Sequence, residues 1–317
     1  MKAIKSMNLL KKIGLFLSTF YILPFVSFAN AEPKVVTSIK PLHSLVSYVM
    51  EGVGTPDIII DGSSSPHTFQ LKHSHASMLQ EADIIFWIGE DLEVFLETPL
   101  DSIAKNVKRV TLMDSNEIDL LKFREKNVFD DHEGHDDHDE HGDEHDGHAH
   151  GEFDIHFWLD PEIAKTIVTI VARELSEIDV ANKSTYEANA KKAINDLDTL
   201  ITETRSKINS DATYIVFHDA YQYFEKRFGI EVIGALTVNP EALPGAKQLA
   251  EIREVIEHEK VNCLFSEPQF NPSIAKTIAQ DTGVKASVLD PLGAELNPGK
   301  DLYFDLIGDM ASSFESC

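Results

Sequence analysis

Short apolar runs alternate with segments of helical periodicity along most of the chain. Strands that are joined by helices pair as parallel strands, because each helix carries the chain back to the same end of the sheet. Four runs precede residue 130 and four follow residue 210. The sequence therefore predicts an α/β protein with two lobes, each built from four βα units around a parallel sheet. The expected strands are residues 35–38, 57–60, 83–89, 107–112, 213–217, 231–236, 262–266 and 285–289.

The longest helical segment, residues 184–208, contains no Gly or Pro and carries one apolar stripe. At 1.5 Å per residue it would reach about 40 Å. A helix of that length can act as a rigid strut between two lobes, although an ordinary packed helix has the same periodicity. We expect an N-terminal lobe at residues 32–180, a linker helix at 181–210 and a C-terminal lobe at 211–317.

Residues 130–150 contain ten carboxylates and seven histidines, with no Lys, Arg or large apolar side chain. Such a stretch cannot bury a core, so we expect a solvated, disordered loop within the N-terminal lobe. Imidazole is a nitrogen ligand for borderline metals, and the carboxylates attract cations. A plain acidic spacer is the alternative, but a spacer needs no imidazole. The candidate ligands of a secondary metal site are His132, His135, His138, His141, His145, His148 and His150.

The N-terminus predicts export. Residues 1–31 combine four lysines with an apolar run and end in the small-x-small sequence Ala29-Asn30-Ala31. This pattern is typical of a signal peptide cleaved after about Ala31, and the simplest destination is the bacterial periplasm. An uncleaved anchor is the alternative. The formal charge of −25, of which residues 130–150 supply −10, disfavours nucleic acid and anionic membrane surfaces as partners.

The chain has two cysteines, Cys263 and Cys317. In an exported protein an even pair suggests one disulfide. The alternative, that both are metal ligands, is less consistent with one cysteine in an apolar strand and the other at the last position.

Three histidines stand at strand–loop junctions: His67, His156 and His218. Ligands of parallel sheets gather in the loops after the carboxyl ends of strands. Three imidazoles and one oxygen would make a tetrahedral site suited to Zn²⁺, whereas a mostly carboxylate set would favour manganese. Asp290 and Glu267 also follow strands and are candidate oxygen ligands. Each has an ordinary alternative, a turn-forming Asp and a buried structural carboxylate.

Several segments match one known family in their order and spacing. They are SIKPLHSLV at 38–46, SPH at 65–67, EADIIFWIG at 81–89, DIHFWLDP at 154–161, FHDAYQYF at 217–224, LFSEPQF at 264–270 and LDPLG at 289–293. Over nearly all of residues 33–317 the chain resembles the metal-binding solute-binding proteins of bacterial ABC importers. In this resemblance the charged stretch at 130–150 is the mark of the zinc type, ZnuA.

The resemblance implies two (βα)4 lobes joined by one long rigid helix, with the metal in the interlobe cleft. It implies His67, His156 and His218 as ligands of zinc. Some family members have a Glu immediately before the first His, but Pro66 stands here, so water or Asp290 is the expected fourth ligand. Manganese relatives carry a Glu in place of the third His, so His218 favours zinc. The resemblance also implies a disulfide near the C-terminus.

The function implied by the resemblance is capture of Zn²⁺ and its delivery to an ABC permease with its ATPase at the inner membrane. Periplasmic zinc chaperones are further expected partners, and the protein is expected to be a monomer and not an enzyme. A periplasmic zinc hydrolase is one rival, because three His plus water also hold catalytic zinc. No HExxH motif is present. A zinc buffer that works only through residues 130–150 is the second rival.

Overall fold

The computed structural model describes residues 32–317 except 125, 129–150, 209–211, 241 and 243. The predicted signal peptide and the candidate secondary metal ligands at 130–150 therefore lie outside the described residues. Within the described part of the chain, no helix is long and apolar enough to cross a membrane.

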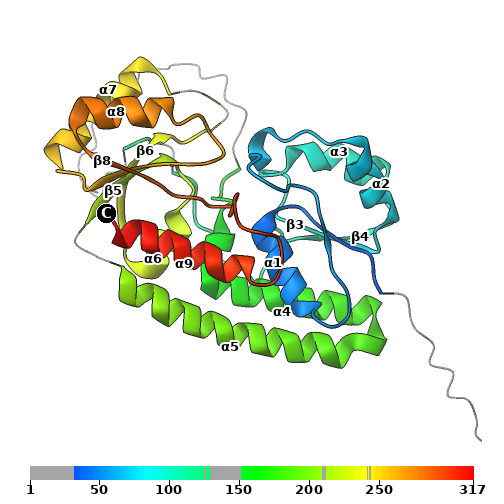
Figure 1. The fold of residues 1–317 in the computed structure, drawn as a ribbon. Coiled ribbons are helices and arrows are strands. Elements are labelled where there is room, and N and C mark those ends of the chain that lie inside the picture. The colour runs from blue at the N-terminus through cyan, green and yellow to red at the C-terminus, as the bar shows by residue number, and fades with distance from the viewer. Residues whose placement is uncertain (1–31, 125, 129–150, 209–211, 241, 243) are drawn as a thin grey trace, which may run out of the picture. The chain divides into compact units, whose positions relative to one another are not determined.

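Two four-stranded parallel sheets form the framework, as the strand–helix alternation predicts (Figure 1). The first sheet has the order β2-β1-β3-β4 and the second has the order β6-β5-β7-β8. The central strands are buried along their length, which explains their continuous apolar sequences. The strands are β1 (Val35–Thr37), β2 (Asp57–Ile58), β3 (Ile84–Trp87), β4 (Lys108–Thr111), β5 (Thr213–His218), β6 (Glu231–Thr237), β7 (Cys263–Ser266) and β8 (Lys285–Val288).

Helices follow the strands in both halves and confirm the predicted α/β class. The first turns of α1 and α4 contain Pro41 and Pro161, because the fixed φ of Pro suits the first helical turn and its missing N–H is not needed there. The α-helices are α1 (Lys40–Val49), α2 (His73–Glu81), α3 (Val94–Ser102), α4 (Pro161–Ile178), α5 (Lys183–Lys207), α6 (Gln222–Phe228), α7 (Ala246–His258), α8 (Ser273–Thr282) and α9 (Leu302–Glu315).

The long helix predicted at residues 184–208 is present as α5. Its 25 residues correspond to about 37 Å of helix. It packs against α4 and α1, which belong to the first half, and against α9 at the end of the second half. Figure 1 shows α4, α5 and α9 running beneath the two sheets. The same helix is thus both a connection and a packed element, held through its buried face of Tyr186, Ala190, Ala193, Leu197, Leu200 and Ile201.

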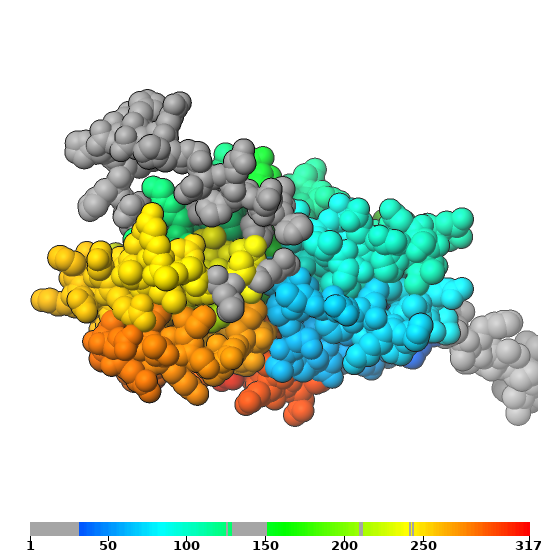
Figure 2. All heavy atoms as spheres, turned by 90° about the horizontal axis from the view of Figure 1, so that it is seen from above, coloured from blue at the N-terminus to red at the C-terminus, as the bar shows by residue number. Residues whose placement is uncertain are grey.

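Hydrogen bonds join the two halves directly. Lys40, whose side chain is only 3% exposed, donates from Nζ to the carbonyl oxygens of Ala294 and Leu296. Trp158 Nε1 donates to the carbonyl of Pro291, and Tyr303 donates to the carbonyl of Trp158. These donors are buried, so breaking one bond would leave an unpaired polar group. In the space-filling view the two halves abut along a seam (Figure 2).

Residues 121–128, here called the crossing segment, also connect the halves. Val128 forms an antiparallel bridge with Gly234 of β6, and Asn127 Nδ2 donates to the carbonyls of Ala235 and Leu236. A Cβ at position 234 would lie 2.8 Å from the Asn127 carbonyl oxygen, so glycine permits this close approach. The described residues of the crossing segment therefore lie against the edge strand of the second sheet.

The chain returns beside the crossing segment after residue 150. Lys122 and Phe153 form an antiparallel bridge, and Phe123 N donates to the carbonyl of Glu152. Asp154 N donates to the carbonyl of Leu121. This pairing fixes the segment that leads into His156.

Cys263 and Cys317 form a disulfide. It links β7 to the second residue after α9, across a sequence separation of 54. The bond anchors the C-terminus to the second sheet.

Candidate metal site

The three predicted histidines lie together. Each offers one nitrogen, and these atoms lie within 4.8 Å of one another. His67 is half-buried in a 3-10 turn at Pro66–Thr68, where Ser65 Oγ accepts a hydrogen bond from its backbone N–H. His156 precedes the turn Phe157–Leu159, and His218 ends β5; both are buried. Within the described residues, this is the one group of three or more His, Cys, Asp or Glu side chains arranged to hold a metal.

Two buried carboxylates orient two of the imidazoles. Asp154 Oδ1 lies 2.8 Å from His156 Nδ1, and both Glu267 oxygens lie 2.8 Å from His218 Nδ1. A carboxylate accepts hydrogen bonds, so each Nδ1 carries the proton and donates it. In a neutral ring protonated at Nδ1, Nε2 carries a free lone pair that can bind a metal. Carboxylates commonly fix the rings of metal-binding histidines in this way.

The facing lone pairs suit a tetrahedral ion. His156 Nε2 and His218 Nε2 lie 3.4 Å apart. Two nitrogens on a tetrahedral Zn²⁺ with bonds of about 2.0–2.1 Å would be separated by about 3.3–3.4 Å. Two lone pairs at this distance repel one another unless a proton or a cation lies between them. The geometry therefore matches a zinc ion without rearrangement of these two rings.

Burial favours a metal over a proton at this position. Burial, followed by the effect of His218, holds the pKa of His156 well below its usual value. Burial also raises the pKa of Asp154 to about 7. A divalent cation bound to three neutral imidazoles would balance the charges of Asp154 and Glu267, and would lower the pKa of a nearby carboxyl.

Apolar side chains enclose the nitrogen cluster. The ring of Trp158 lies 5.2 Å from that of His156, and the ring of Phe270 lies 5.6 Å from that of His218, measured between centroids. The three histidines line a small cavity, and Gln269, Pro291 and Leu292 also line it. Walls of this kind strengthen the electrostatic attraction between the ion and its ligands.

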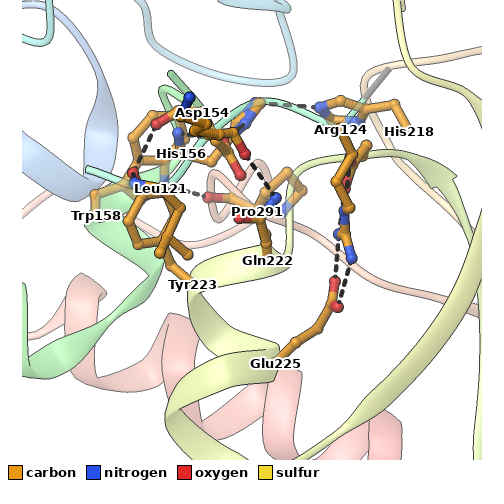
Figure 3. A network of polar contacts seen from close by, with 12 residues as sticks. Leu121, Arg124, Asp154, His156, Trp158, His218, Gln222, Tyr223, Glu225 and Pro291 are labelled. Atoms are coloured by element: carbon orange, nitrogen blue, oxygen red, sulfur yellow. Dashed lines mark hydrogen bonds and ion pairs between the residues drawn. The ribbon is translucent and has the colours of Figure 1, made fainter. Parts of the chain in front are cut away.

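A second polar network lies behind His218. Arg124 of the crossing segment donates from Nε to Asp219 Oδ2 at 2.9 Å and from Nη1 to Glu225 Oε2 at 3.0 Å. Asp219 follows His218 directly, and Glu225 lies on α6. Tyr223 donates to the carbonyl of Asp154 and accepts from the N–H of Leu121. Figure 3 shows Arg124 reaching toward Glu225 while His218 and His156 face each other.

The comparison with protein families gives one match, which covers residues 35–317. The family is described as "ZnuA: Zinc-uptake complex component A periplasmic". The chain belongs to this family. It is 42% identical to the high-affinity zinc uptake system protein ZnuA of Brucella abortus, over 96% of this chain and 98% of the relative. It is 35% identical to the protein of the same name in Yersinia pestis, over 92% of each.

Solved structures agree with the family in fold. A crystal structure of ZnuA superposes with a TM-score of 0.73 at 22% identity, and covers 90% of this chain and 98% of that one. A Zn(II)-bound variant of AdcAII from Streptococcus pneumoniae has a TM-score of 0.70 at 26% identity, with 90% and 99% covered.

The oxygen candidates take different positions from the histidines. Asp290 lies outside the nitrogen cluster. Its Oδ1 accepts from the N–H groups of Leu292 and Gly293, and its Oδ2 accepts from that of Ala294. These hydrogen bonds form the turn after β8. Glu267 supports His218 through hydrogen bonds.

Residue-by-residue reading of the sequence did not assign the supporting roles of Asp154 and Arg124. Asp154 stands two residues before His156, a spacing that allows a carboxylate to contact the following imidazole, so a signal was present. Arg124 and its partners are about a hundred residues apart, and no local pattern connects them. His43 is also buried, but its Nε2 lies 3.1 Å from the Pro56 carbonyl oxygen and it is not part of the nitrogen cluster.

Proposed function

We propose that the protein is the high-affinity periplasmic zinc-binding component of an ABC importer, which captures Zn²⁺ and delivers it to the membrane permease. Membership of the zinc-uptake family supports this function. The single observation that carries the choice of metal is the pair of facing Nε2 atoms, 3.4 Å apart, whose rings are fixed by Asp154 and Glu267.

In this proposal His67, His156 and His218 bind the ion, and a solvent oxygen or Asp290 completes the tetrahedron. Zinc is the cargo. Residues 32–180 and 211–317 act as the two lobes and 181–210 as the linker. The direct hydrogen bonds between the halves favour small adjustments over a wide hinge motion on binding.

The partners in this proposal are the cognate permease with its ATPase, and periplasmic zinc chaperones. A signal peptide cleaved after about Ala31 would bring the protein to the periplasm, where it would act as a monomer. Residues 130–150 would collect zinc with lower affinity and pass it to the nitrogen cluster.

Calorimetry of the mature protein lacking residues 130–150 tests the site. We expect one tightly bound zinc per chain, and loss of that binding in each of His67→Ala, His156→Ala and His218→Ala. His258→Ala is the matched control, because His258 is exposed at the end of α7. Tight binding that survives in all three variants would refute the site.

Two further measurements distinguish the rivals. A buffer that works only through residues 130–150 would lose its tight zinc when they are deleted. Growth of a gene-deletion strain in chelated medium, with rescue by added zinc, separates an importer component from a hydrolase.

A further inference from the structure

Gln269 presents a buried amide oxygen without a partner beside the three histidines. The residue lines the same cavity as His67, His156 and His218. Its Oε1 is buried and has no hydrogen-bond donor within the described part of the chain. An unpaired buried acceptor costs about 1–3 kcal/mol, so such an atom in a binding cavity points to a donor that arrives with the ligand.

The orientation of this amide is fixed. Gln269 Nε2 donates to Asp290 Oδ1 at 2.8 Å. Asp290 itself is held by backbone N–H groups of Leu292, Gly293 and Ala294. A carboxylate only accepts, so the NH2 end of the amide must face Asp290 and the carbonyl end must face away from it. The turn after β8 thus sets the direction of Gln269 Oε1.

The coordination of a tetrahedral ion leaves one position for an oxygen. Three imidazoles fill three positions, and no other His, Cys, Asp or Glu of the described residues joins their cluster. Both oxygens of Glu267 contact His218 Nδ1. Asp290 lies outside the cluster and accepts hydrogen bonds at both oxygens. No carboxylate of the described residues is left to supply this oxygen, which points to a water molecule. A metal-bound water is a strong hydrogen-bond donor.

We propose that Gln269 Oε1 accepts a hydrogen bond from the water that completes the coordination of the bound zinc, and that Asp290 acts on the site through Gln269. This inference rests on the proposed function, since it assumes zinc on the three histidines. Gln269 is then a positioning residue of the site. Its amide is neutral and is not a base, so it holds the water without activating it for hydrolysis.

The test combines affinity with a spectroscopic signal. Gln269→Leu removes the acceptor, and zinc binding should weaken by about tenfold, at the low end of the range for residues that orient metal ligands. The visible spectrum of the Co²⁺-loaded protein should change as well, because the fourth ligand is no longer held in place. Gln248→Leu is the control. Gln248 lies on α7 in the second half, and its Nε2 also donates to a side-chain oxygen, Asn127 Oδ1.

Asp290→Asn distinguishes the indirect role from direct ligation. If Asp290 acts through Gln269, the double variant Asp290→Asn/Gln269→Leu should bind zinc within about twofold of Gln269→Leu alone, because a coupled pair is not additive. A loss of more than a hundredfold for Asp290→Asn, additive with Gln269→Leu, would overturn the proposal and make Asp290 a ligand.

The outcomes separate this inference from the proposed function. Wild-type protein that fails to bind one zinc through His67, His156 and His218 refutes the function. Alternatively, zinc binding of the wild type depends on these histidines, but Gln269→Leu leaves the affinity and the Co²⁺ spectrum unchanged. That result overturns the hydrogen bond between the zinc-bound water and Gln269 and leaves the proposed function standing. If Gln269→Leu does not fold, Gln269→Met, which keeps the side-chain length, is read by the same two criteria.

Discussion

Replacement of Arg124 by Leu should destabilise the protein strongly. The side chain of Arg124 is 22% exposed, and its partners Asp219 and Glu225 are 1% and 10% exposed. The variant keeps the hydrophobic stem of the side chain and leaves two buried carboxylates without their cation. Removing one partner of a buried pair costs about 3–5 kcal/mol. Urea unfolding of the metal-free protein would measure the loss of free energy of unfolding.

Arg173→Leu is the matched control for this change. Arg173 also pairs with two carboxylates, Glu117 and Glu174, but it is 46% exposed on α4. Exposed pairs contribute about 0–1 kcal/mol, so the control should stay close to wild type. Glu225→Gln added to Arg124→Leu should recover part of the loss by removing one uncompensated charge. Equal small losses for both arginines, or a double variant that loses additively, would refute the reasoning.

Three other outcomes are expected. Glu267→Gln should weaken zinc binding by about 10–100-fold in calorimetry at unchanged stoichiometry, because the His218 ring loses its charged acceptor; unchanged affinity would contradict this role. The double variant Cys263→Ser/Cys317→Ser should lose about 4 kcal/mol of unfolding free energy, as a bond across 54 positions constrains the unfolded chain; a loss below about 1 kcal/mol would argue against it. Burial raises the pKa of Glu93 to about 7 from its usual 4.5, so its contribution to stability is present below pH 4.5 and is lost as the pH rises through 7. The stability of the metal-free protein should therefore fall between about pH 4.5 and 7, and Glu93→Gln should reduce that fall by about 1–3 kcal/mol. An identical slope in the variant would count against the assignment.

The central strands of the two sheets were predictable because they are buried on both faces. Runs such as residues 83–89 stay apolar without alternation, and helices with one apolar stripe separate them. His67 and His218 were predictable for a related reason, since residues after the carboxyl ends of parallel strands converge at one edge. His156 reaches the same place by another route, because it follows the chain that pairs with residues 121–123 and not the end of a strand.

Predicting Glu267 as the partner of His218 requires the order of the strands. In the pairing of β5 with β7, Tyr214 lies opposite Cys263 and Ile215 opposite Leu264. The same register, continued by three residues, brings His218 to Glu267. A single sequence does not state that β7, and not β8, lies next to β5. The pairing of His218 with Glu267 could therefore not be predicted from the sequence. Asp290 illustrates the reverse case, because its position after a strand is equally compatible with a ligand and with a turn.

The antiparallel bridge between Lys122 and Phe153 has a consequence for protein engineering. Lys122 and Phe153 are neighbours in the structure, so the chain between residues 122 and 153 is already closed into a loop at its base. The entropy of closing such a loop grows only with the logarithm of its length, about 0.6 kcal/mol for each doubling. A folded domain whose termini lie close together could therefore replace residues 130–150 at small cost in stability.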